Sequence, residues 1–259
     1  MGRTGSAVAI REATLAGYTR LGGGISLLHA PRLTGKAREV QSYLGEGYST
    51  LDGILSVDPP GIMALLVADD DWKDAPRENA RPYPQGLPYF TRSVEPPALV
   101  LPEELSSVFE PRTAATLPLT VWHELAHAFL LGREVVRTPA WLGEFVPQAA
   151  SAAIARKSGL SLDEHLSQIE EEPGFTVRQF RGQMSAEAQM SFQNLLLLLG
   201  DAAIDEFGEG FLDRLFHALW EEDEIVDEDR AEELLADALG PGGSQWLASR
   251  PEFVPRGER

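Results

Sequence analysis

The ten residues from 120 to 129, TVWHELAHAF, limit the possible folds of this chain more than any other stretch of it. Apolar residues surround His123, Glu124 and His127 on nearly every side of a helix, which is the pattern of a helix buried in the core. Burying three ionisable side chains is costly unless each has a partner. The segment therefore predicts a buried helix over about 119–131 whose polar side chains share a ligand.

The spacing HExxH in this segment suits a metal ion. Residues four apart in an α-helix differ by only about 40° in direction and about 6 Å in height, so His123 and His127 can turn ring nitrogens toward one ion. Zinc accepts two imidazoles in this way. Glu124 points elsewhere, but its carboxylate can reach a water molecule held by the ion, which predicts that Glu124 is the general base. The alternative is a hydrogen-bonded pair of core histidines without a metal.

A third protein ligand is needed, because catalytic zinc usually takes three and keeps one position open. The chain has no cysteine, so the third ligand must be a histidine or a carboxylate. Glu144 follows His127 by seventeen residues, and Gly132 and Pro139 can turn the chain between them. We expect a helix that starts near Thr138, runs back beside the first and presents Glu144 from its first turn. Otherwise Glu144 is a first-turn acid favoured by the helix dipole.

Together, HELAH and the later WLGEF resemble the two motifs of the gluzincin metallopeptidases, a peptidase MA-like group. The resemblance implies one Zn²⁺ ion with ligands His123, His127 and Glu144, with Glu124 as the base, and a peptide or protein substrate. It also implies an edge strand near residues 87–101 that holds an extended peptide by β-addition. A different HExxH family, such as the intracellular repressor-cleaving type, would take its third ligand from further downstream. Two other acids, Glu134 and Glu164, fit the third position less well.

Two departures from the gluzincin pattern surround the third ligand. Gly143 precedes Glu144 instead of following it. Gln148 stands where some relatives have a carboxylate that orients a metal-bound histidine.

A third departure concerns the oxyanion of the tetrahedral intermediate, which relatives often stabilise with a downstream tyrosine or histidine. The last tyrosine here is Tyr89, and the corresponding position falls near Phe192 or Gln193, neither of which has a phenol. A second hypothesis therefore stays open: a zinc-binding protein that hydrolyses poorly or not at all and serves as a binding or regulatory module. Other side chains could serve as the donor, although a surface or structural role is the simpler expectation for each: His165, His217, Arg178, Arg181, Tyr83 and Tyr89.

The balance of charge restricts the partners. The chain has 40 acidic and 22 basic side chains, a formal net charge of -18, which argues against nucleic acids and anionic membranes. No apolar run approaches the roughly 20 residues of a membrane span, and Arg11 and Glu12 interrupt the N-terminal segment before it reaches the length of a signal peptide. We therefore expect a cytoplasmic protein with no nucleic-acid or membrane partner. The sequence predicts nothing about the oligomeric state.

The distribution of hydrophobic residues predicts an α+β fold with a small mixed β-sheet and a packed helix in its N-terminal part. The N-terminal part contains one helix candidate, 36–55, and four strand candidates, 24–29, 62–68, 87–92 and 98–101. Residues 69–84 read as a long loop or flap. The C-terminal part contains five helix candidates, 119–131, 142–157, 185–203, 210–220 and 229–239.

A change in composition near residues 110–118 separates these two parts of the chain. We expect an α/β subdomain with the edge strand over 1–115 and a helical subdomain over 116–259. Because ligands often bind between such units, the zinc site is expected in the cleft between them.

Overall fold

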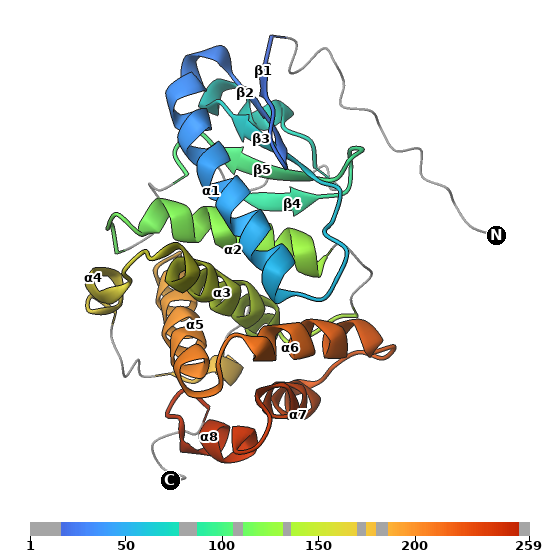
Figure 1. Cartoon of the computed structure of the whole chain (residues 1–259), viewed down its shortest axis with the longest axis vertical. Helices are drawn as coiled ribbons and strands as arrows, with labels where there is room; N and C mark the ends of the chain where they lie inside the picture. The colour runs from blue at the N-terminus through green and yellow to red at the C-terminus, as the bar shows by residue number, and fades with distance from the viewer. Residues whose placement is uncertain are drawn as a thin grey trace, which may run out of the picture.

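The computed structural model describes residues 17–77, 87–105, 111–131, 136–169, 175–179 and 186–253. It confirms the α+β class, with a five-stranded mixed sheet in the N-terminal part and helices through the C-terminal part (Figure 1). The boundary at residue 115 stays a prediction. One hydrophobic cluster joins the sheet to the helices on both sides of that boundary.

The sheet has the strand order β1-β2-β3-β5-β4, in which β2, β3 and β5 are parallel and the two outer strands are antiparallel to their neighbours. β4 forms one edge, as the resemblance implied. The short strand β1, at the other edge, was not predicted, since its three residues carry no apolar pattern. The strands are β1 (Thr19–Leu21), β2 (Ser26–His29), β3 (Met63–Val67), β4 (Tyr89–Thr91) and β5 (Ala98–Pro102).

The central strands β3 and β5 are buried on both faces, which explains why their sequences are continuous apolar runs. In β3, Ala64 and Leu66 face the main core with the helices, whereas Leu65 and Val67 face a second cluster. Trp72 belongs to that second cluster and covers the face of the sheet away from the helices. Alternate residues of a single strand therefore help to build two cores.

Eight α-helices and three short 3-10 helices occur among the described residues. In Figure 1, α1 runs alongside the sheet, and α2 lies between the sheet and the remaining helices, in contact with β4, β5 and α3. The α-helices are α1 (Thr34–Ile54), α2 (Thr116–Leu130), α3 (Ala140–Ser158), α4 (Asp163–Leu166), α5 (Ala186–Phe207), α6 (Gly210–Glu221), α7 (Glu228–Leu239) and α8 (Gly243–Ser249). The 3-10 helices are η1 (Pro31–Leu33), η2 (Asp69–Asp74) and η3 (Val177–Gln179).

The expected loop over 69–84 begins differently from the prediction. Its first residues form η2, in which Trp72 is buried, and Tyr89 packs edge-on against that indole with ring centroids 5.7 Å apart. The sequence of η2, DDDWKD, has no helical period of apolar residues, so it did not predict this helix. The structure shows that Trp72 is the residue of η2 that is buried. Residues 78–86 of the expected flap lie outside the described residues.

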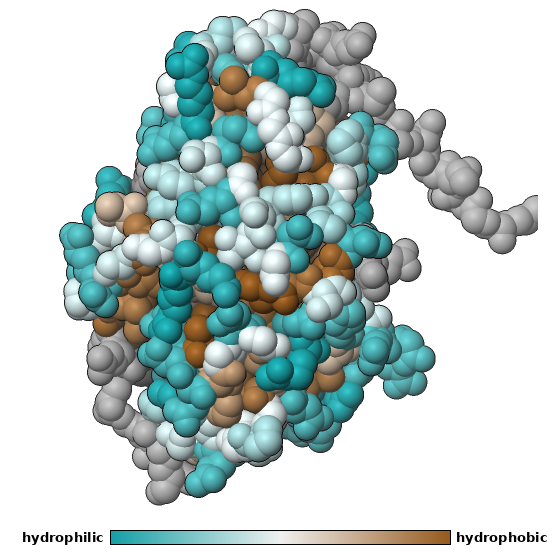
Figure 2. Space-filling model, in the orientation of Figure 1, coloured by the Kyte–Doolittle hydropathy of each residue, from teal (hydrophilic) through white to brown (hydrophobic). Residues whose placement is uncertain are grey.

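Polar residues cover most of the face seen in Figure 2, with hydrophobic areas between them. Within the described ranges, Ile225 is the one large hydrophobic side chain classed as exposed, at 73%. No helix in those ranges has both the length and the apolar composition needed to cross a membrane.

Helices α3 and α5 approach each other closely at Gly200 of α5. A Cβ atom built on Gly200 would lie 2.7 Å from Cα of Ala149 in α3, which is backbone that cannot turn away. We expect Gly200→Ala to lower the free energy of unfolding by about 1–3 kcal/mol, because the helices must separate. Chemical denaturation measures this change.

The matched control for this prediction is Gly45→Ala in α1. A Cβ at Gly45 meets no atom within 4 Å, so the substitution should stabilise the helix by roughly 0.5–1 kcal/mol. Equal effects at the two glycines would contradict the close approach of α3 and α5.

Candidate metal site

Helix α2 is held in the core on almost all sides, as its composition predicted. Trp122, which is 1% exposed, donates a hydrogen bond from Nε1 to the carbonyl oxygen of Tyr43 at 2.9 Å and so ties α2 to α1. Gly47 of α1 makes room for the same indole, because a Cβ there would lie 2.6 Å from its Cδ1. These contacts restrict the rotation of α2 and hence the direction in which His123 and His127 point.

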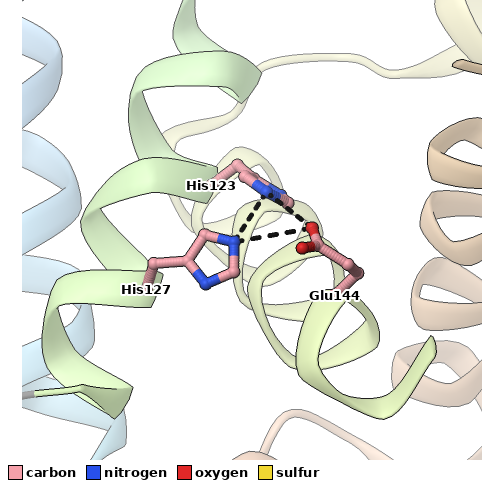
Figure 3. Close-up of side chains that lie close together, drawn as sticks. All are labelled: His123, His127 and Glu144. Carbon is pink, nitrogen blue, oxygen red and sulfur yellow. Dashed lines mark hydrogen bonds and ion pairs between the residues drawn. The ribbon is translucent and has the colours of Figure 1, made fainter. Parts of the chain in front are cut away.

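The structure brings His123, His127 and Glu144 together (Figure 3). Nε2 of His123 lies 3.1 Å from Nε2 of His127, and Oε2 of Glu144 lies 3.3 Å from the first nitrogen and 3.5 Å from the second. At zinc's bond lengths of about 2.0–2.1 Å, ligand atoms in a tetrahedral site are about 3.3 Å apart. The three atoms are therefore spaced like three corners of a metal coordination tetrahedron.

The donor set and its exposure also fit a metal ion. Two imidazole nitrogens and one carboxylate oxygen are ligands that a divalent metal such as zinc accepts. The side chains of His123, His127 and Glu144 are 12%, 19% and 28% exposed, so the site is sheltered but reachable. One feature of His123 departs from the usual pattern. Its Nδ1 is buried and has no hydrogen-bond partner among the described residues, whereas the second nitrogen of a metal-bound histidine usually has an acceptor.

Glu144 reaches the two histidines from α3, although not from the position expected. Pro139 precedes the helix, which begins at Ala140, so Glu144 is its fifth residue and not a member of its first turn. The prediction of a first-turn position was wrong, and so was the alternative of a first-turn acid at the helix dipole, since that turn contains no acid. Trp141, buried just before Glu144, anchors this end of α3 by donating from Nε1 to Oε2 of Glu228 at 2.7 Å.

The charges of His127 and Glu144 stabilise each other. Burial alone would raise the pKa of Glu144, but the charge of His127 and hydrogen bonds from both imidazoles bring it well below its ordinary value. Burial alone would lower the pKa of His127, but the charge of Glu144 raises it above its ordinary value. The two shifts favour a proton on His127 and an ionised carboxyl group on Glu144.

The raised pKa of His127 predicts how metal binding depends on pH. A metal ion must displace the proton, so the apparent affinity should fall as the pH drops through that pKa, starting above the ordinary histidine value of about 6.5. The affinity should be fully present at higher pH. Zinc titrations against a competing chelator between pH 5.5 and 8.5 measure this, and an affinity unchanged over that range would contradict a site with imidazole ligands.

Glu124 is buried in α2 next to His123, with 7% of its surface exposed. Burial raises its pKa, the two imidazoles oppose that shift and the carboxylate of Glu144 adds to it. A carboxylate with a raised pKa beside a metal site is a stronger base than one in water. Its role as general base stays a prediction.

The sequence did not predict the contact that Gln193 makes with the triad of His123, His127 and Glu144. From α5, Gln193 donates a hydrogen bond from Nε2 to Oε2 of Glu144 at 2.7 Å. Gln148 of α3 in turn donates from Nε2 to Oε1 of Gln193 at 2.6 Å. The only signal was that Gln193 lies near the position where relatives have their oxyanion donor.

Two other candidates for the oxyanion donor, His165 and His217, differ in exposure: the first is buried and the second is partly exposed. His165 was expected at the surface, but it is 5% exposed, its Nδ1 lies 2.9 Å from Oγ1 of Thr113, and burial lowers its pKa. The surface prediction was wrong because Asp163 and Glu164 face solvent while His165 turns inward from the same short helix. His217 has a 41% exposed side chain 3.6 Å from Asp213, in agreement with a surface role.

Two further candidate donors have partners of their own. Arg178 pairs with Glu232 and Asp229 of α7, at 2.5 Å and 3.2 Å. Tyr89 donates its hydroxyl to the carbonyl oxygen of Pro76 at 2.9 Å. Three of the candidate donors and ligands considered from the sequence lie outside the described residues: Tyr83, Glu134 and Arg181.

Comparisons with known proteins add no relative: no protein-family model matches the sequence, and a search of curated proteins finds no match. The gluzincin relationship therefore stays a prediction from two motifs. The expected cleft at the metal site also stays a prediction; one hollow among the described residues lies around α7 and α8, lined by residues between 236 and 245.

Proposed function

We propose that this chain is a single-zinc metallopeptidase of the gluzincin type, in which His123, His127 and Glu144 hold the ion. The observation that carries the proposal is the spacing of the three ligand atoms, 3.1 Å, 3.3 Å and 3.5 Å, together with a buried acid one residue after the first histidine. A structural pair of histidines would not need a third group whose oxygen completes the same triangle.

In the proposed hydrolysis of a peptide bond, the bound ion and Glu124 have separate roles. A bound zinc ion would supply Lewis-acid polarisation of the scissile carbonyl and acidify the attacking water. Glu124 takes the proton from that water as its oxygen attacks the carbonyl carbon, and passes it to the amine nitrogen as the C–N bond breaks. The water thus contributes a hydroxyl to the acyl product and a proton to the amine product.

The arrangement of α2 and the sheet supports a peptide as the substrate. Helix α2, which carries His123 and His127, contacts the edge strand β4, so a peptide that added to this edge would run beside the helix of the two histidines. β4 is only three residues long, which suits recognition of a short extended segment. The formal net charge of -18 makes a polyanionic substrate such as a nucleic acid unfavourable.

A second candidate function is a zinc-binding module with little or no hydrolytic activity. It is favoured because candidate donors for the oxyanion are engaged elsewhere: Arg178 and Tyr89 have their own partners, and Gln193 is hydrogen-bonded to Glu144. The loss of one such donor typically lowers the rate about 10²–10³-fold. A slow peptidase and a binding module therefore differ in degree of turnover.

Incubation of the zinc-loaded protein with a mixed peptide library, read by mass spectrometry, distinguishes these functions. The peptidase is expected to produce new peptide ends that disappear when a chelator removes the metal and return when zinc is added. Bound zinc without new ends would support the binding module and contradict the peptidase. Anomalous scattering at the zinc edge from crystals of the loaded protein would identify the ligands directly.

A further inference from the structure

We propose that Gln193, oriented by Gln148, is a positioning residue that holds the ligand oxygen of Glu144 in place for the metal ion. This inference rests on the proposed metal site. It assigns a role to two glutamines from different helices that the hydrolytic mechanism does not use.

The hydrogen bond from Gln193 reaches the ligand atom itself. Its Nε2 lies 2.7 Å from Oε2 of Glu144, and this oxygen is the one that lies 3.3 Å from His123 and 3.5 Å from His127. A carboxylate oxygen has two lone-pair sites, so one can face the metal while the other accepts from the amide. The contact therefore restricts the rotation of the carboxylate without occupying its metal-binding side.

The direction of this chain of hydrogen bonds follows from chemistry. An ionised carboxylate can only accept, so the NH₂ group of Gln193 must face Glu144. The amide oxygen of Gln193 then faces Gln148, whose own NH₂ group must donate to it at 2.6 Å. The two hydrogen bonds are satisfied together only if each amide in the chain has this one orientation.

A neutral donor has a particular advantage at this position. A lysine or arginine would hold the carboxylate equally well, but its positive charge would oppose a divalent ion a few ångströms away. An amide orients Glu144 and leaves the negative charge of the site available to the metal. Gln193 is itself only partly exposed, which strengthens the hydrogen bond relative to one in water.

The helices that carry the two glutamines are closely packed. Gln148 lies one turn after Glu144 in α3, and Ala149, the next residue, touches α5 at Gly200. Gln193 comes from α5, so the relay joins the ligand to a second helix and not only to its own. Figure 1 shows α3 and α5 side by side.

The substitution Gln193→Met keeps the length of the side chain and removes the donor. We expect the affinity for Zn²⁺, measured by competition with a chromophoric chelator, to fall about 10–100-fold, as for other hydrogen-bond partners of metal ligands. Gln148→Met should weaken binding in the same direction by a smaller factor, since Gln193 keeps its own donor. Gln193→Glu, which places a second carboxylate against Glu144, should change the visible absorption bands of the Co²⁺-loaded protein, because the ligand oxygen is displaced.

Two controls separate positioning from general destabilisation. Gln41→Met in α1 removes an amide that donates to the carbonyl oxygen of Ile25 at 2.9 Å, far along the chain from the triad, and should leave the zinc affinity unchanged. In a Glu144→Ala background, Gln193→Met should have no further effect on zinc affinity, because the relay acts only through Glu144.

The outcomes are distinct for the two proposals. A wild-type protein that does not bind zinc overturns both the metal site and the relay. Zinc binding by the wild type with equal affinity in Gln193→Met and Gln148→Met overturns the relay alone. An equal loss of affinity with Glu144 present and absent also overturns it. If circular dichroism shows that Gln193→Met does not fold, Gln148→Met and Gln193→Glu decide the question by the same measurements.

Discussion

A Glu124→Gln variant is expected to bind zinc as tightly as the wild type and to cleave peptides about 10²–10⁴-fold more slowly, which is the usual contribution of a general base. Glutamine has the shape of glutamate but cannot take a proton from the attacking water. It leaves the nitrogens of His123 and His127 and the oxygen of Glu144 untouched. The measurement is the initial rate of cleavage of one peptide selected from the library, with the metal content determined on the same sample.

The same variant should be at least as stable as the wild type. Burial raises the pKa of Glu124 in the folded protein, so the ionised carboxylate opposes folding at a pH above both the folded and unfolded values. An uncharged glutamine removes that opposition, and unfolding cannot then account for the lost activity. Glu164→Gln, at an exposed acid in α4, is the matched control and should leave rate and stability unchanged. Full activity in Glu124→Gln would refute the assignment of the base.

Glu144→Gln should weaken zinc binding by more than the roughly 10–100-fold expected for the loss of an outer hydrogen-bond partner. The substitution replaces a charged ligand with a neutral amide that binds zinc poorly, and it leaves two imidazoles to hold the ion. Chelator competition at pH 8 measures the affinity, with Glu124→Gln as the control that alters a nearby acid outside the triad. Unchanged affinity would exclude Glu144 and favour a family whose third ligand lies further downstream.

Much of the fold could be predicted from local patterns. The helices over 142–157 and 210–220 were predicted within two residues of the observed α3 and α6, because their apolar residues recur with a helical period and their ends carry turn residues. The parallel strands β3 and β5 were recognisable because a strand covered on both faces is apolar throughout.

The short elements could not be predicted in this way. β1 has three residues, of which two are exposed, and α8 has seven, of which three are buried. Such segments carry too few periodic positions to stand out from a loop. β1 forms because it pairs with β2, and α8 because it packs against α7.

Within the candidate site, the sequence predicted the residues that local geometry brings together, but not the contacts between distant segments. HExxH places His123 and His127 on one side of a helix through local geometry alone, and Glu144 follows from the need for a third ligand. Gln193 lies 49 residues after Glu144, and its contact depends on how α5 packs against α3. The inward turn of His165 toward Thr113 is likewise a matter of packing between segments 52 residues apart.

The sequence by itself thus determined the α+β class, the metal-binding spacing and the three ligand candidates, since these depend on the period of a helix and on the chemistry of the side chains. The tertiary structure alone decided that the three candidate ligand atoms meet within 3.5 Å, that the edge strand contacts the helix of the two histidines and that Gln148 and Gln193 form a chain of hydrogen bonds to Glu144. Contacts between distant segments depend on the packing of whole helices, to which every residue of the core contributes, and no local pattern encodes them.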